Sequence, residues 1–221
     1  MNFSAANPRR LMHERRIDCH GFRRNDGLWD IEGRIVDTKP FATEESYRGH
    51  RPAESEVHNI AIRLTIDDDF QVHDIEVLMP EVPYPTCSGA IPNYRKLIGA
   101  RIGPGWRKAV NAVVGSTAGC THARELLFPM ATVAFQTLYG WEETLASPEE
   151  KERREARAED RRRKEGADPD RPLFLDGCYS WSSEREVVAR LYPRFARTPG
   201  DSTAARSASA RSSAEQSSAK R

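Results

Sequence analysis

The sequence predicts an α+β fold, in which a small antiparallel sheet of three to four strands packs against the helices that follow it. Within residues 28–37, 58–66 and 70–79, apolar and polar side chains alternate, as expected for strands with one buried face. Beyond residue 90, apolar residues recur at helical spacing instead. Strands that come first and helices that come later favour α+β over an alternating α/β fold.

The predicted strands include a hairpin with a short acidic turn. Residues 58–66 and 70–79 flank the three aspartates at 67–69, and so short a polar connection is typical of an antiparallel pair. The even positions of the first of these strands share one face, which begins with His58 and is otherwise apolar. A further strand is predicted over residues 28–37.

The remaining predicted elements are a long loop and three helical segments. The loop covers residues 39–55, is rich in polar and charged residues, and is long enough to act as a lid. Helical spacing begins at residues 91–97, breaks at the glycines and proline of residues 98–105, and resumes at residues 106–114. The longest helix is predicted over residues 121–139.

The distribution of charge and apolar residues predicts the domain organisation. We expect residues 1–146 and 171–196 to form a single domain. Residues 147–170 carry dense charge of both signs, which is typical of a solvated helix or a linker. Residues 197–221 consist largely of Arg, Ser and Ala and contain no large apolar side chain. Such a segment cannot bury enough surface to offset the entropy of ordering, so we predict a disordered tail.

The overall composition narrows the class of protein. The formal net charge of +1 argues against general binding to nucleic acid or to an anionic membrane. No apolar run approaches the roughly 20 residues needed to cross a bilayer, and the start lacks the order of a signal peptide. The four cysteines are far apart, which indicates free thiols rather than a zinc ribbon or a disulfide framework. These observations predict a cytoplasmic protein.

The most reactive side chains gather just before and within the first turn of the longest predicted helix. Cys120, His122 and Glu125 lie there, where a helix N-terminus favours anions. Cys120 could be a nucleophile with His122 as its base. Alternatively, the same residues could hold a transition metal, with the site completed by His58 or another carboxylate. In the third interpretation the residues only pack and form structural hydrogen bonds, as a lone histidine on an apolar strand face usually does.

Other polar residues are weaker candidates for functional sites. Residues 9–24 are dense in arginine and could clamp an anion. Asp30 and Glu32 share a strand face, where they could serve as acid and base or, more simply, form salt bridges on an exposed surface. Cys87 and Cys178 could approach the site from loops.

Several ordered motifs resemble a bacterial family designated as a domain of unknown function. The resemblance spans about residues 8–195 and implies a role close to the bacterial degradation of aromatic or similar small molecules. The family pattern is matched here at His58, Cys120, His122 and Glu125. The motifs that carry the resemblance are Arg15-Arg-Ile, Asp26-Gly-Leu-Trp-Asp-Ile-Glu-Gly, Asp37-Thr-Lys, His58, Arg63-Leu-Thr-Ile-Asp, Gly119-Cys-Thr-His and Glu125-Leu-Leu.

The clustered reactive groups lead to the hypothesis of an enzyme of the lyase or hydrolase type. It would act on a small anionic or aromatic organic molecule by acid/base chemistry. The sequence is also compatible with assistance from a thiol or a metal. His122 would be the general acid/base, supported by Glu125. Cys120 would be the nucleophile or a metal ligand, and His58 a second proton carrier or ligand. No cofactor is required by the sequence, and a transition metal is compatible with it.

Substrate binding is assigned to two arginines and two tryptophans. Arg16 and Arg63 would hold a carboxylate, while Trp29 and Trp106 would wall the pocket. One rival hypothesis is a ligand-binding or accessory protein without turnover, in which the same residues shape a pocket. A second is nucleic-acid binding through the basic ends, which the balanced charge disfavours. A homo-oligomer is compatible with the sequence.

Overall fold

The computed structural model describes residue 4 and residues 6–141, 145–165, 168, 171–172 and 174–198. The chain divides into two compact units, Met1–Arg154 and Glu155–Arg221. The sheet and the helices packed on it belong to the first unit. This part of the chain confirms the predicted α+β fold.

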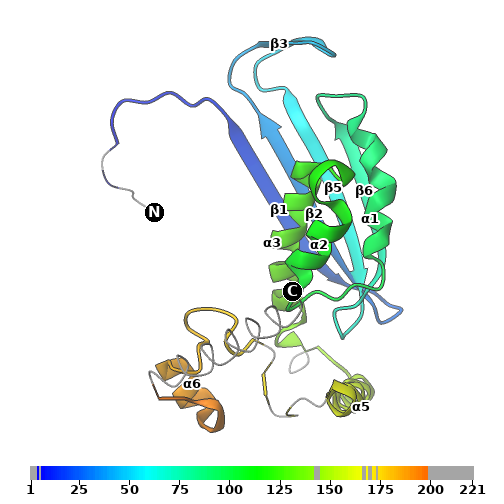
Figure 1. Ribbon diagram of the computed structural model, residues 1–221, viewed down its shortest axis with the longest axis vertical. Coiled ribbons are helices and arrows are strands. Elements are labelled where there is room, and N and C mark those ends of the chain that lie inside the picture. The colour runs from blue at the N-terminus through cyan, green and yellow to red at the C-terminus, as the bar shows by residue number, and fades with distance from the viewer. Residues whose placement is uncertain are drawn as a thin grey trace, which may run out of the picture. The chain divides into compact units, whose positions relative to one another are not determined.

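A four-stranded antiparallel sheet forms the centre of the first unit (Figure 1). A separate two-stranded hairpin lies within the connection between β2 and β5, where the sequence analysis predicted a loop. In spatial order the sheet consists of β1 (Glu14–Arg23), β2 (Trp29–Thr38), β5 (Glu56–Ile66) and β6 (Val72–Glu81), and the hairpin of β3 (Thr43–Glu45) and β4 (Gly49–Arg51). The acidic turn joins β5 to β6 in an antiparallel hairpin, as predicted.

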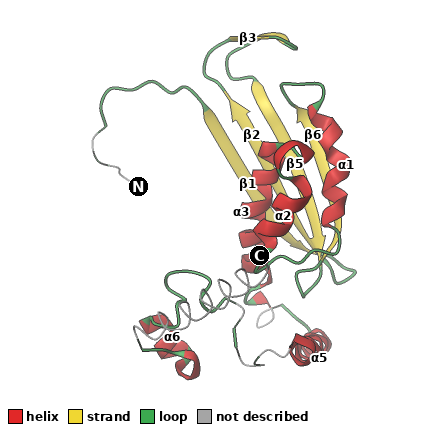
Figure 2. Ribbon diagram, in the orientation of Figure 1, coloured by secondary structure: helices red, strands yellow, loops and turns green. Residues whose placement is uncertain are grey.

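Helices cover one face of the sheet (Figure 2). They are α1 (Ile91–Tyr94), α2 (Trp106–Val114) and α3 (Thr121–Leu138), with short 3₁₀ turns at Cys87–Ala90, Arg95–Leu97 and Ser116–Ala118. Helix α3 packs on β1, β2 and β5, while α1 packs on β6. The core between the two layers is apolar, because alternate strand residues such as Ile31, Ile35, Ile60 and Leu64 are completely buried there.

Two strand glycines let α3 approach the sheet closely. A Cβ atom at Gly33 would lie 2.7 Å from the side chain of Met130, and one at Gly21 would overlap Thr137. Both partners belong to α3. The missing side chains on β1 and β2 therefore let the middle and the last turn of α3 lie close to the sheet.

The opposite face of the sheet is charged, and its ion pairs run across the strands. Arg63 on β5 donates to Glu32 on β2 at 2.8 Å and to Glu76 on β6 at 3.1 Å. Asp30 accepts a hydrogen bond from Thr65 at 2.7 Å. The arrangement supports the salt-bridge interpretation of Asp30 and Glu32.

Strand β1 was not predicted from the sequence. It forms from the arginine-dense segment and pairs along its whole length with β2. Because most of its side chains are exposed, β1 lacks the alternation of buried and polar residues by which the other strands were recognised. The pairing has a functional consequence, since it brings residues near the start of the chain to the end of β2.

The second unit contains less regular structure. Helix α5 (Pro148–Glu165) leads into it from the first unit, and α6 (Glu186–Leu191) lies within it. Aromatic rings of Phe174, Trp181 and Tyr192 form a local cluster, with ring centroids 4.4 Å apart for the closest pair. Helix α5 covers residues 148–165 of the segment that the sequence predicts to be a charged helix or a linker. The predicted packing of residues 171–196 on the main domain stays a prediction, and the predicted tail lies outside the described residues except for 197 and 198.

Within the described residues, we find no helix with both the length and the apolar character required to cross a membrane.

Candidate functional site

A buried carboxylate lies at the end of β2. Asp37 continues the helix-facing row of that strand after Trp29, Ile31 and Ile35, and only 1% of the residue is exposed. The strand register sets Arg15 of β1 opposite it on one side and His58 of β5 opposite it on the other. Cross-strand pairs of this kind have neighbouring side chains, so three ionisable groups meet in one row.

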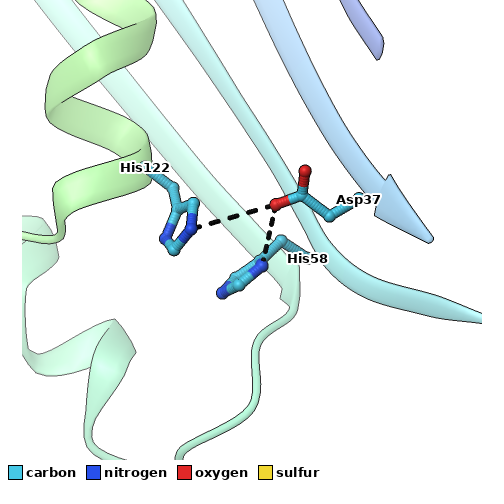
Figure 3. Close-up of side chains that lie close together, drawn as sticks. All are labelled: Asp37, His58 and His122. Atoms are coloured by element: carbon cyan, nitrogen blue, oxygen red, sulfur yellow. Dashed lines mark ion pairs between the residues drawn. The ribbon is translucent and has the colours of Figure 1, made fainter. Parts of the chain in front are cut away.

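The imidazoles of His58 and His122 meet the carboxylate of Asp37 from two different elements (Figure 3). His58 Nδ1 lies 2.9 Å from Asp37 Oδ2, and His122 Nε2, on the first turn of α3, lies 3.9 Å from the same oxygen. The two rings stack with their centroids 3.7 Å apart and their planes inclined by 30°. The three side chains therefore form one compact group, which we call the Asp–His–His cluster.

Two basic residues bind Asp37 from its other side. Arg15 donates from Nε to Oδ1 at 2.7 Å and from a terminal nitrogen to Oδ2 at 2.8 Å. His13 Nε2 lies 3.2 Å from Oδ1. A forked arginine–carboxylate pair fixes the orientation of the carboxylate plane, so Asp37 is held toward the two stacked rings.

A fully buried tyrosine positions the start of α3. The Tyr94 hydroxyl donates to the carbonyl oxygen of Cys120 at 3.1 Å and accepts from the amide of Cys120 at 3.2 Å. Cys120 occupies the N-cap position of α3, so His122 follows in the first turn. The preceding residue, Gly119, lies so close to Val114 that a Cβ atom would overlap its carbonyl oxygen. These contacts determine where His122 is presented.

Burial and the neighbouring charges keep both imidazoles neutral at pH 7. Burial, together with the proximity of His122, lowers the pKa of His58 to about 4, against the opposing effect of Asp37. Burial and the charge of Arg15 likewise lower the pKa of His122. For Asp37, burial by itself would raise the pKa, but the hydrogen bonds and charge of Arg15 outweigh it and the pKa is lowered. The resting cluster thus consists of a carboxylate and two neutral imidazoles.

The two imidazoles line a cavity of about 400 Å³. The cavity lies between residues 83–93, which precede and include α1, and residues 117–122, which lead into α3. Its lining includes Cys87, Cys120 and Tyr84. A volume of this size suits a small organic molecule.

The structure brings together most of the predicted catalytic residues. His58 and His122 stack on each other, and Cys120 Sγ lies 4.0 Å from His122 Nδ1. The carboxylate of Glu125 pairs with Arg124 at 2.9 Å, its side chain is 45% exposed, and its charge also acts on Arg15. Cys87 reaches the same cavity, whereas Cys178 belongs to the second unit. All four thiols are free, as predicted.

The structure does not bring the predicted substrate-binding residues to this cavity. Arg16 pairs with Glu14 at 2.9 Å, and Arg63 is engaged on the charged face of the sheet. Trp29 is buried in the core, where its ring contacts that of Trp141. Trp106 is buried too, and its indole nitrogen donates to the carbonyl oxygen of Leu127 at 3.1 Å. The two tryptophans therefore serve the core.

Sequence reasoning missed Asp37, Arg15 and His13. A signal for Asp37 was present, because it extends the odd-numbered apolar row of β2 and a carboxylate at a buried-face position needs a partner. No such signal existed for Arg15, because its strand was not predicted and its neighbour Arg16 has the same side chain. The pairing of β1 with β2 decides which arginine reaches the cluster.

The Asp–His–His cluster can support two kinds of chemistry. Neutral imidazoles next to a carboxylate can accept and return protons near pH 7. Two imidazoles and a carboxylate are also a ligand set for divalent transition metals, and one ligand atom from each residue lies within 4.8 Å of the others. The cavity gives a small molecule access to either.

One known protein family matches the part of the chain that contains the cluster. The family described as "Protein of unknown function (DUF2889)" matches residues 13–136, which is more than half of the chain. The chain belongs to this family. The matched segment runs from His13 into the last turn of α3 and includes every member of the cluster, together with Arg15 and Cys120. Neither a curated protein nor a solved structure matches the chain.

Proposed function

We propose that this protein of the DUF2889 family is an enzyme that performs acid/base chemistry of the lyase or hydrolase type on a small organic molecule. The observation that carries the proposal is the contact between the Asp–His–His cluster and the 400 Å³ cavity. Buried ionisable groups with lowered pKa values that converge on a concave site are typical of active sites.

His122 is the proposed proton carrier. It is the more accessible of the two imidazoles, with 28% of its side chain exposed against 12% for His58. Being neutral at pH 7, it can take a proton from the substrate or from a water molecule and return it later in the cycle. Asp37 stabilises the imidazolium that forms in between, since the ionised carboxylate lies 3.9 Å from Nε2.

Cys120 has a second proposed role in the same chemistry. Its thiol lines the cavity 4.0 Å from His122 Nδ1, a distance that shortens to a hydrogen bond with a small rotation of either side chain. His122 could then accept the thiol proton and make Cys120 a nucleophile. A cysteine used in this way needs to remain reduced, so we propose that the enzyme acts in the cytoplasm.

The substrate class that we propose is a small aromatic or anionic molecule. Tyr84 offers an exposed ring for stacking, and the space is sufficient for one aromatic acid of moderate size. This choice agrees with the resemblance to proteins associated with the breakdown of aromatic molecules.

The test is a turnover screen with the purified full-length protein. Small aromatic and aliphatic carboxylic acids, their esters and their hydroxy derivatives are incubated with it, and products are followed by mass spectrometry. We expect His122→Ala to lower kcat/KM for any converted compound at least about 100-fold, as is usual for loss of a general acid or base. The control is His73→Ala, which removes a histidine from an exposed His–Asp pair outside the cluster.

Two results would contradict the proposal. Equal turnover by wild type and His122→Ala would remove the cluster from the reaction. Saturable binding of a compound without turnover by any preparation would instead favour a binding or accessory protein, the main rival class. Ligand-induced shifts of the melting temperature measure such binding independently of chemistry.

A further inference from the structure

We propose that Asp37, His58 and His122 together bind one divalent first-row transition-metal ion. The inference rests on the proposed function in taking this cluster as the reaction centre. With the ion bound, His122 would be a ligand, and a water molecule on the ion would replace it as the proton acceptor. The ligands of the ion come from the end of β2, the beginning of β5 and the first turn of α3.

The spacing of the donor atoms suits a single ion. Metal bonds to imidazole nitrogen and carboxylate oxygen are about 2.0 to 2.2 Å long, so two donors of one ion lie up to about 4.4 Å apart. Asp37 Oδ2 is 2.9 Å from His58 Nδ1 and 3.9 Å from His122 Nε2. Since one donor atom from each of the three residues lies within 4.8 Å of the others, only small side-chain rotations separate the group from a ligand arrangement.

An unsatisfied ring nitrogen points to a missing partner. His58 Nδ1 is buried and has no hydrogen-bond partner among the residues that the structure describes, although Asp37 Oδ2 is only 2.9 Å away. The short distance without hydrogen-bond geometry means that the nitrogen is not directed at the oxygen. A buried polar atom left unpaired destabilises the fold. A metal ion between the two atoms would give the nitrogen a partner and join it to the same carboxylate.

The residues around Asp37 form hydrogen bonds like those that orient a metal ligand from outside the coordination shell. Arg15 donates hydrogen bonds to both carboxylate oxygens of Asp37, and His13 Nε2 lies 3.2 Å from Oδ1. Outer hydrogen bonds of this kind orient ligating carboxylates and strengthen metal sites. Each carboxylate oxygen has two lone pairs, so Oδ2 can accept from Arg15 and still bind an ion.

The charge balance predicts what binds from the cavity. Arg15 already offsets the charge of Asp37, and the imidazoles are neutral ligands, so a divalent ion leaves an excess of positive charge. With three protein ligands, at least one coordination position remains open, as in catalytic rather than structural sites. The cavity lies beside the two imidazoles. We therefore expect an anion, such as a substrate carboxylate, to take the open position.

The test measures metal binding without using turnover. Full-length protein with its affinity tag removed is stripped with a chelator and titrated with Zn²⁺ by calorimetry and with Co²⁺ by visible absorption. We expect one ion per chain, and at least about a tenfold loss of affinity in His58→Gln and in His122→Ala. The matched control is His73→Ala, whose histidine pairs with Asp67 at 2.8 Å at an exposed position. It should bind as wild type does.

Further variants keep the test decisive. Circular dichroism checks that each variant is folded. If His58→Gln does not fold, His122→Ala decides the outcome, because His122 is only partly buried. Cys120→Ser is expected to retain one ion per chain, and loss of binding in that variant would assign the ion to a thiol site and overturn the proposal. Absence of stoichiometric binding by wild type would overturn it as well. If wild type converts a substrate but binds no metal ion, the metal inference fails and the proposed function stands.

Discussion

Asp37 and Tyr94 are the two residues that hold the reactive groups in place. Asp37 is the common partner of Arg15, His13, His58 and His122, and it keeps its charge in a buried position because Arg15 binds both of its oxygens. Tyr94 has no ionic role. Its hydroxyl pairs with the backbone of Cys120 as donor and as acceptor, which ties the start of α3 to α1.

Replacing the Tyr94 hydroxyl should therefore destabilise the fold. In Tyr94→Phe the amide and carbonyl of Cys120 lose these hydrogen bonds, and we expect the free energy of unfolding to fall by about 1 to 3 kcal/mol. Urea unfolding at pH 7 measures the difference. The control is Tyr84→Phe, because Tyr84 lines the same cavity with an exposed ring and should leave stability unchanged.

Because of Tyr94, we expect the stability of the fold to depend on pH in the alkaline range. The usual pKa of a tyrosine phenol is about 10, and burial raises the pKa of Tyr94 above that value. Between the unfolded and the folded pKa, the unfolded chain releases a proton that the folded chain retains, so the free energy of unfolding declines as pH rises beyond about 10. The decline should be smaller in Tyr94→Phe. Equal declines in both proteins would show that Tyr94 does not titrate in this way.

At the scale of elements, the site arises where three chain segments end or begin. β2 ends just after Asp37, β5 begins two residues before His58, and α3 begins one residue before His122. The register of β2 with β5 sets Asp37 opposite His58 with no contribution from loops. His122 depends on a turn instead, and that turn is made of small residues held by Val114 and Tyr94.

A methyl group in this turn should displace His122. Gly119→Ala would push a Cβ atom against the carbonyl oxygen of Val114, and backbone cannot yield as a side chain can. We expect a loss of about 1 to 3 kcal/mol in the free energy of unfolding and weaker Zn²⁺ binding. The control is Gly89→Ala, since Gly89 lines the same cavity and a Cβ atom there meets nothing within 4 Å. Equal effects of the two substitutions would argue against the close contact.

At the scale of the whole molecule, one core carries the site. The main cluster of buried apolar residues runs from Trp29 to Leu138 within the first unit, whereas Leu175 and Val188 are buried outside it. The Asp–His–His cluster lies at the margin of this core. A reaction centre placed on a sheet and a packed helix is held more rigidly than one on loops alone.

This organisation predicts that the first unit folds without the second. A chain ending at Arg154 should keep its far-ultraviolet circular dichroism per residue for the sheet and helices, unfold cooperatively in urea and bind Zn²⁺ as the full chain does. Loss of cooperative unfolding in the shortened chain would show that residues beyond 154 contribute to the core.

The sequence by itself determined the strands with one buried face, the hairpin at residues 67–69 and the helices at 106–114 and 121–138. Periodicity is a local property, and these elements bury one face in a regular pattern. The reactive run at Cys120 and His122 was recognisable for a similar reason, because its residues are neighbours in the chain. β1 escaped recognition because an exposed edge strand has no such pattern.

The tertiary structure alone decided the partners of His122. Asp37, Arg15 and His58 lie far from it in sequence, and they meet only because β1, β2 and β5 pair in one register and α3 starts above their ends. The same pairing separates Arg16 from Arg15, since successive strand residues point to opposite faces. Composition and spacing carry no information about strand pairing, and so the sequence indicated His58 and His122 while the fold supplied the carboxylate between them.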